Sequence, residues 1–144
     1  MAGIGGAVGI ILGWLSPLRD AVNNIHDNVA KFKPKAFRST SKEFWATSSS
    51  DFETAINVNG AGMLYGLSFV RTCSISMDVT FTLKVTLDGV TMQIANESIP
   101  LSKKGTVITF PLNYHFVESC KVEAQTRISS GSCDGGNLDV FYYV

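Results

Sequence analysis

The stretch "VTFTLKVTLDGVTMQIA", residues 79–95, decides the fold class of this chain. Apolar and polar side chains alternate along its first half, which is typical of a strand with one face on a core and one toward water. Asp88 and Gly89 suit the positive φ angles of a type I′ turn, and the apolar series resumes at Val90. The stretch therefore predicts an antiparallel β-hairpin.

The two-residue period continues on both sides of this hairpin. The apolar face of its first strand is expected to comprise Ile75, Met77, Val79, Phe81, Leu83, Val85 and Leu87. Further short strands are expected within residues 55–70, 106–112, 119–128 and 138–144, with a glycine-rich loop at 129–137 before the last one. Seven or eight strands without a helical stretch between them predict an antiparallel β-sandwich, jelly-roll-like in its connections.

The N-terminal segment has a helical period instead. Its apolar residues follow one another at steps of four and three, which is a heptad seam over four repeats. The seam consists of Ile4, Val8, Ile11, Leu15, Leu18, Val22, Ile25, Val29 and Phe32. Because most of them are β-branched at both core positions of the heptad, the pattern favours trimers or tetramers over dimers.

The seam is expected to belong to a separate arm of the chain. Five glycines before residue 14 weaken a helix, and Ser16-Pro17 resembles a helix start, so we expect a break there and a firmer helix from residue 17 to 33. Residues 34–51 are rich in Ser, Thr and Lys and lack periodicity. The predicted organisation is an oligomerisation or anchoring arm at 1–33, an extended linker at 34–51 and a β-sandwich head at 52–144.

Three roles remain open for the apolar arm. The first is self-association, which the tether-like segment after the arm favours. The second is packing of the arm on its own domain, and the third is insertion into a membrane. Residues 1–17 carry no charged side chain, but this run is shorter than the roughly 20 residues of a spanning helix and contains five glycines. Homo-oligomerisation is therefore the leading interpretation, and a membrane partner ranks second.

Composition argues against a general affinity for nucleic acid. The formal net charge is zero, charged residues make up 17% of the chain and apolar residues 45%. Basic residues gather at Lys31, Lys33, Lys35, Arg38 and Lys42, among aromatic side chains, but an arm that docks on a neighbouring subunit explains them as well. No specific nucleic-acid partner is predicted.

The sequence contains no recognisable catalytic, cofactor or metal site. His26 and His115 have no carboxylate or cysteine at ligand spacing, and Asp134, Asn137 and Asp139 lack the pattern of a calcium loop. Cys73, Cys120 and Cys133 permit one disulfide but are interpreted mainly as small buried thiols. Sugar stacking is an alternative role for exposed aromatic residues, with these candidates: Trp45, Tyr65, Tyr114, Tyr142 and Tyr143.

Three segments of the chain resemble bacteriophage virion structural proteins with small β-sandwich domains. They are "INVNGAGMLYGLSF", "LKVTLDGVTMQI" and "HFVESCKVEAQ", which together span residues 55–125. The resemblance implies a building role in a head, neck or tail, and it brings no active-site residue with it. The expected function is a non-enzymatic virion protein, a homotrimeric fibre, spike or decoration subunit. Its expected partners are other copies, other virion proteins and a host-surface glycan or receptor.

Overall fold

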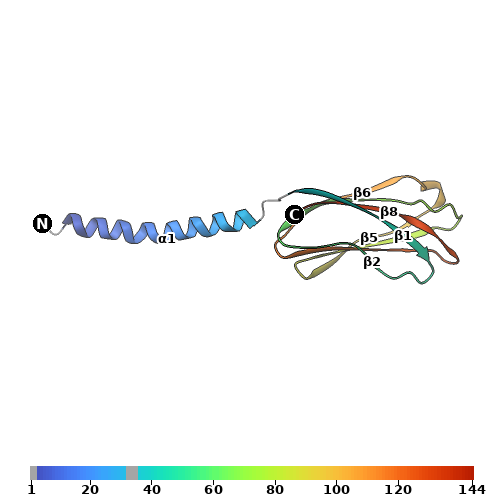
Figure 1. Cartoon of the computed structure of the whole chain (residues 1–144), viewed down its shortest axis with the longest axis horizontal. Helices are drawn as coiled ribbons and strands as arrows, with labels where there is room; N and C mark the ends of the chain where they lie inside the picture. The colour runs from blue at the N-terminus through green and yellow to red at the C-terminus, as the bar shows by residue number, and fades with distance from the viewer. Residues whose placement is uncertain (1–2, 32–35) are drawn as a thin grey trace. The chain divides into compact units, whose positions relative to one another are not determined.

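The computed structural model describes the backbone of residues 3–31 and 36–144, and the chain divides into two compact units, Met1–Lys33 and Pro34–Val144 (Figure 1). The described part of the first unit is helix α1 (Gly3–Lys31). The second unit, called the head below, contains the following elements: β1 (Phe37–Thr47), β2 (Glu53–Asn59), β3 (Gly62–Val70), β4 (Val79–Leu87), β5 (Val90–Ile99), the short 3-10 helix η1 (Leu101–Lys103), β6 (Val107–Phe116), β7 (Ser119–Arg127) and β8 (Ser132–Tyr143).

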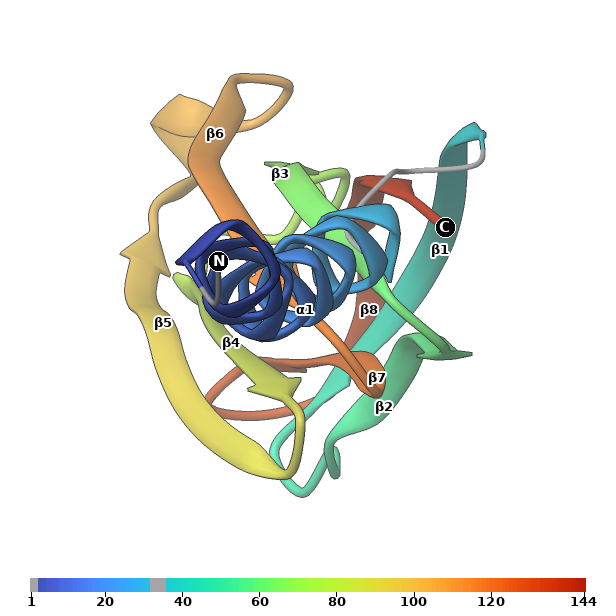
Figure 2. The same cartoon turned by 90° about the vertical axis from the view of Figure 1, so that its left-hand side faces the viewer.

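The strands of the head are hydrogen-bonded into one eight-stranded sheet, which curls into two four-stranded layers, called the two sheets of the jelly roll below. Strands β1, β8, β3 and β6 are neighbours in one sheet and β2, β7, β4 and β5 in the other, and all these neighbours are antiparallel. The two layers face each other in Figure 2. At the end of β1, Thr47 pairs in parallel with Arg127 of β7, so the sheet curls from one layer into the other. The predicted fold class, mainly β and jelly-roll-like with an N-terminal helix, is confirmed.

The hairpin of β4 and β5 is the one connection within the described head that stays inside a single sheet, because every other connection crosses to the opposite layer. Leu87 pairs with Val90 across its turn, and Asp88 and Gly89 have φ angles of 49° and 83°. Positive φ at both central residues defines the type I′ turn. The predicted hairpin is therefore confirmed in position and turn type.

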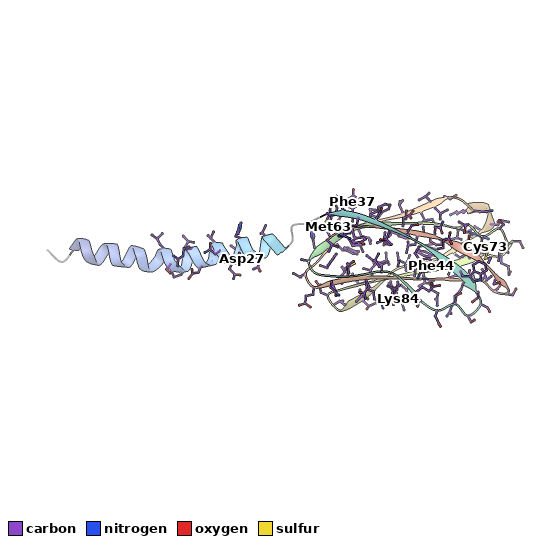
Figure 3. All side chains as sticks on the ribbon, in the orientation of Figure 1. Asp27, Phe37, Phe44, Met63, Cys73 and Lys84 are labelled. Carbon is purple, nitrogen blue, oxygen red and sulfur yellow. A yellow bond between two sulfur atoms is a disulfide. The ribbon has the colours of Figure 1, made fainter. Side chains whose placement is uncertain are left out.

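Apolar side chains from both layers fill the interior of the head (Figure 3). Phe69 of β3 stacks on Phe81 of β4 with ring centroids 3.9 Å apart, which links one sheet to the other. The buried cluster consists of Phe44, Ile56, Leu64, Leu67, Phe69, Phe81, Leu83, Val85, Ala95, Ile99, Phe116, Cys120, Val122, Ala124, Leu138, Val140 and Tyr142. The polar side chains that alternate with these apolar ones along each strand consequently face outward.

Asp88 has a second role that its turn position does not reveal. Its carboxylate accepts hydrogen bonds from the backbone N–H groups of Val117, Glu118 and Ser119, at 2.7–3.1 Å, in the turn between β6 and β7. Desolvation raises the pKa of this carboxyl, but the bonds from Ser119, Glu118 and Val117 together hold it below its usual value. The side chain thus fastens two turns together at one end of the head.

We expect Asp88→Asn to lower the free energy of unfolding by about 1–2 kcal/mol at neutral pH. Asparagine keeps the turn preference but removes the charge and turns an amide N–H toward the N–H of Val117. The carboxylate contributes fully above the unfolded-state pKa of about 3.9 and loses its contribution as the pH falls through the lower folded-state pKa. Urea unfolding of both proteins between pH 7 and pH 2.5 should therefore give converging stabilities, and a constant difference would contradict this role.

A buried arginine organises the segment between β3 and β4. Arg71 is fully buried, and its guanidinium donates hydrogen bonds to the backbone carbonyls of Cys73, Ile75, Met77 and Ile99. The prediction that Ile75 and Met77 belong to the strand is wrong, because β4 begins at Val79. The carbonyls of Ile75 and Met77 accept hydrogen bonds from Arg71 instead of from a neighbouring strand. In the sequence, the two residues nevertheless continue the alternation of apolar and polar residues.

The expected linker at 34–51 is also corrected, because most of it is strand. Strand β1 pairs along its whole length with β8, from Phe37 opposite Tyr143 to Thr47 opposite Ser132. Its Ser, Thr and Lys side chains lie on an edge strand whose outer face meets water, while Phe44 and Ala46 are buried. A strand with only two buried apolar residues leaves no clear alternation in the sequence.

The glycine-rich segment 129–137 was expected to be a loop, but its second half belongs to β8. Gly135 and Gly136 lie at a register shift opposite Phe44 and Trp45. A Cβ on Gly135 would lie 2.6 Å from Oγ1 of Thr126, and one on Gly136 would lie 2.5 Å from the ring of Phe69. These glycines therefore permit close packing between strands, which a loop would not require.

Helix α1 continues through the expected break at Ser16-Pro17. Pro17 cannot donate a hydrogen bond to residue 13, and its ring crowds the carbonyl there. That residue is Gly13, which has no heavy atom within 4 Å of the place of its missing Cβ, so the backbone has room to adjust. The prediction of two separate helical pieces is therefore wrong for the described backbone.

Candidate functional site

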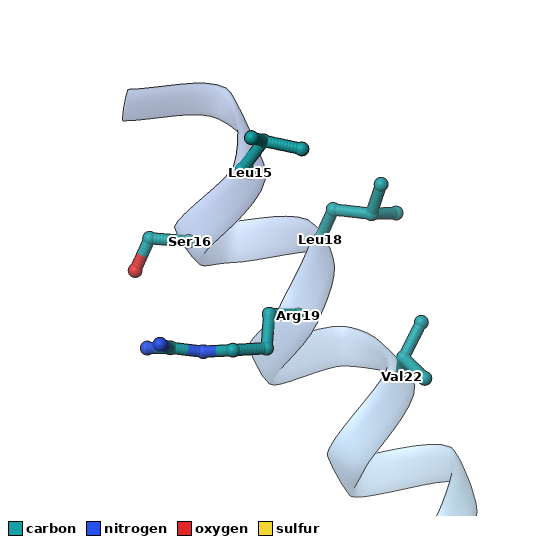
Figure 4. A pocket seen from close by; sticks show the side chains of 5 residues that line it. All are labelled: Leu15, Ser16, Leu18, Arg19 and Val22. Carbon is teal, nitrogen blue, oxygen red and sulfur yellow. The ribbon is translucent and has the colours of Figure 1, made fainter. Parts of the chain in front are cut away.

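An exposed apolar stripe runs along helix α1. Its described members are Leu15, Leu18, Val22, Ile25 and Val29, whose side chains are 51–63% exposed. They are spaced by three and four residues, which brings them to one side of an α-helix within a narrow arc. Figure 4 shows Leu15, Leu18 and Val22 on this side, while Ser16 and Arg19 point away from it.

The opposite side of the helix is polar. Asn28 donates a side-chain hydrogen bond to Asn24 at 3.3 Å, one turn earlier, and Arg19 forms an exposed ion pair with Asp20 at 3.4 Å. His26 is exposed as well. The described part of the helix is therefore amphipathic, with its apolar side exposed.

The stripe contains five of the nine predicted seam residues. The side chains of Ile4, Val8 and Ile11 lie outside the described ones, and Phe32 lies outside the described residues altogether. In the described part of the chain, no helix is long and apolar enough to cross a membrane. Whether the seam joins copies of the chain stays a prediction, because no second copy is present.

The head gathers part of the aromatic set predicted for sugar stacking. Tyr65 and Tyr143 lie on one outer face, with ring centroids 6.5 Å apart. Tyr142 is buried in the core, Tyr114 packs against it, and Trp45 is exposed elsewhere, beside Glu43, Glu53 and Asp134. The sequence missed Phe37 and Phe141, which join Tyr65 and Tyr143 on the same face.

The residues considered for metal binding do not gather. Asp134 lines the hollow near Trp45, whereas Asp139 lies near Ser68, whose hydroxyl is 3.5 Å from its carboxylate. Among the described residues, no three His, Cys, Asp or Glu side chains are arranged to hold a metal ion. His115 lies exposed on β6.

Two of the three cysteines are paired, contrary to their interpretation as free thiols. Cys73 and Cys133 form a disulfide with Cα atoms 5.8 Å apart, which joins the segment after β3 to the start of β8. Cys73 lies at the end of the head opposite Phe37 and Met63 (Figure 3). Cys120 is a buried free thiol, as expected, and burial raises its pKa to about 12. It is therefore protonated and unreactive at neutral pH.

The basic residues near the start of the head are only partly described. Lys42 forms an ion pair with Glu53 at 3.0 Å and donates a hydrogen bond to the carbonyl of Thr54 at 3.1 Å, which ties β1 to β2. Arg38 is exposed on β1, and Lys33 and Lys35 lie outside the described residues. Lys42 thus has a structural role in the head.

Comparison with known proteins gives likeness of fold only. No protein-family model matches the sequence, and no curated protein is similar to it. A structure of infectious bursal disease virus, Gx strain, is 17% identical with a TM-score of 0.45 over 76% of this chain and 34% of that chain. The T13 particle of that virus is 18% identical, with a TM-score of 0.47 over 74% of this chain and 30% of that chain. The Yersinia pseudotuberculosis-derived mitogen is 12% identical, with a TM-score of 0.34 over 78% of this chain and 87% of that chain. The chain spans about a third of the viral chains it matches.

Proposed function

We propose that this protein is a non-enzymatic structural subunit of a virion, a fibre, spike or decoration protein. It assembles as a homotrimer through helix α1, its N-terminal segment anchors it to other virion proteins, and the jelly-roll head is presented outward. The observation that carries the proposal is the exposed stripe from Leu15 to Val29, which lies opposite polar side chains such as Asp20 and Asn24. The sequence resemblance to phage virion structural proteins supports the same role.

A second copy of the helix is the partner that fits the stripe best. Its residues repeat with the heptad spacing, so an identical helix in parallel offers matching apolar side chains at every level. Burying the exposed half of one Leu, Ile or Val contributes about 1 kcal/mol, or about 5 kcal/mol per chain for five residues. One association step costs about 4–15 kcal/mol, so the two steps that form a trimer cost about 8–30 kcal/mol, and the roughly 15 kcal/mol from three chains offsets the lower part of that range. The four seam residues without described side chains would extend the interface.

The test compares two variants that each introduce one carboxylate at adjacent positions. Ile25→Asp places it in the stripe, and Asn24→Asp places it on the polar side. We expect Ile25→Asp to weaken assembly of the full chain at least about tenfold, because a charge in a coiled-coil core is desolvated. Asn24→Asp should leave assembly unchanged. Sedimentation equilibrium over a range of concentrations measures both, and equal behaviour of the two variants would refute the stripe as the interface.

A further inference from the structure

The outer face of the β1–β8–β3–β6 sheet carries a row of four aromatic side chains. Phe37 lies 5.1 Å from Tyr143 and 6.3 Å from Phe141 between ring centroids, and Tyr65 lies 6.5 Å from Tyr143. Phe37 and Tyr65 are 54% and 52% exposed. The core on the other side of this sheet is already filled by residues such as Leu64 and Tyr142, so packing does not account for the row.

A hollow lies beside this row because one strand position has no side chain. Gly66 of β3 is in register with Phe141 of β8 on one side and with Pro111 of β6 on the other. Strands β8 and β6, on either side of β3, are about 10 Å apart. The missing side chain of Gly66 therefore leaves a slot one ring wide between Phe141 and Pro111. The hollow measures about 260 Å³. Tyr65, at the bulge before Gly66, forms part of its wall.

The side chains around the hollow favour a neutral ligand with hydroxyl groups. Ser68 and Thr109, paired across β3 and β6, bring two hydroxyls to it, and Asn113 brings an amide. The residues that line the hollow include no Asp, Glu, Lys, Arg or His. The Ser68 hydroxyl also donates a hydrogen bond to the carboxylate of Asp139 at 3.5 Å, so an anion such as phosphate would find no counter-charge at the hollow. Aromatic faces beside hydroxyl, amide and carboxylate groups complement a ring with C–H faces and hydroxyl edges.

From this combination we propose that the hollow binds a neutral hexopyranose unit of a glycan. One face of the sugar ring packs against Phe141 and Tyr65, and its hydroxyls exchange hydrogen bonds with Ser68, Thr109 and Asn113. The aromatic row extends the contact toward Tyr143 and Phe37, where a neighbouring sugar unit of a longer chain would lie. The site lies wholly within the head and does not depend on assembly through the helix.

The test uses saturation-transfer-difference NMR on the full chain with methyl glucoside, methyl galactoside, methyl mannoside and N-acetylglucosamine as probes. We expect at least one of these pyranosides to bind and Tyr65→Ala to weaken it about tenfold through loss of stacking. Thr109→Val, which keeps the side-chain shape but removes the hydroxyl, should also weaken binding. Trp45→Ala, at an exposed aromatic residue outside the hollow, is the matched control and should bind like the unmodified protein.

Thermal unfolding of each variant checks that the head remains folded, and Thr109→Val provides a second variant if Tyr65→Ala does not fold. The proposal is overturned if no pyranoside gives a signal with the unmodified protein, or if Tyr65→Ala and Trp45→Ala lose it equally. Binding of a proline-rich peptide in place of every pyranoside would also overturn it, since aromatic grooves accept such peptides too.

Discussion

Replacing Arg71 by methionine should lower the free energy of unfolding by about 4 kcal/mol. The guanidinium is the shared donor for the carbonyls of Cys73, Ile75, Met77 and Ile99. Methionine fills a similar volume but leaves these acceptors without a partner inside the protein. Burial lowers the pKa of Arg71 while Asp78 raises it, and an arginine stays charged under both influences.

Urea unfolding monitored by fluorescence and circular dichroism measures this loss. Arg71→Lys is the matched control, because it keeps the positive charge but cannot reach four carbonyls with one ammonium group. We expect its stability to fall between those of the methionine variant and the unmodified protein. If Arg71→Met unfolded at the same urea concentration as the unmodified protein, the carbonyl network would not hold the segment before β4.

Removal of the disulfide is the second change with a large expected effect. The bridge spans a sequence separation of 60 residues. In the chain-entropy model, a loop of this size constrains the unfolded chain by about 4 kcal/mol, so the double variant Cys73→Ser with Cys133→Ser should lose about that much stability. A reducing agent should lower the free energy of unfolding of the unmodified protein by a similar amount, and its unfolding midpoint should move to a lower urea concentration.

The matched control for this experiment is the double variant itself, whose midpoint should not respond to the reducing agent. Thiol titration adds a check, because the unfolded, unreduced protein should show one thiol per chain, from Cys120. A midpoint of the unmodified protein that is insensitive to reduction would contradict the role of the bridge. Arg71 donates to the carbonyl of Cys73, so the losses from the two sites should not add fully.

The sequence pattern was sufficient for the sandwich because its central strands alternate. From Val79 to Val85, every second side chain is buried, and the turn at Asp88-Gly89 has the dihedral angles that its residues favour. Strand β1 was missed since its outward face mixes polar side chains with the exposed Phe37 and Trp45, which hides any alternation, and since its pairing with β8 is a long-range contact. Local patterning carries no information on such a partner.

The features that fasten the head were not predictable for the same reason. The disulfide joins residues far apart in sequence, and only the fold brings Cys73 to the start of β8. The partners of Arg71 lie on the following segment and at the end of β5, so nothing at its own position reveals that it is buried. The aromatic row likewise depends on the register of three strands. Two of its members, Phe37 and Phe141, were consequently not among the predicted stacking residues.

The helix presents a different situation, since its described residues agree with the predicted amphipathic pattern. Leu15, Leu18, Val22, Ile25 and Val29 are all exposed, as a seam requires before partners bind. The pattern is local, with a period that helix geometry fixes, which explains why the sequence was sufficient to identify this surface. Whether copies of the chain meet there, and how many, depends on packing between chains and remains a prediction.

Native mass spectrometry of the full chain, beside a variant reduced to residues 34–144, tests the central claim most directly. We expect an assembly of three times the 15.6 kDa chain mass for the full protein and a folded monomer for the shortened one. A full chain that stays monomeric at the concentrations of the experiment, or a shortened chain that still forms trimers, would contradict assembly through the helix.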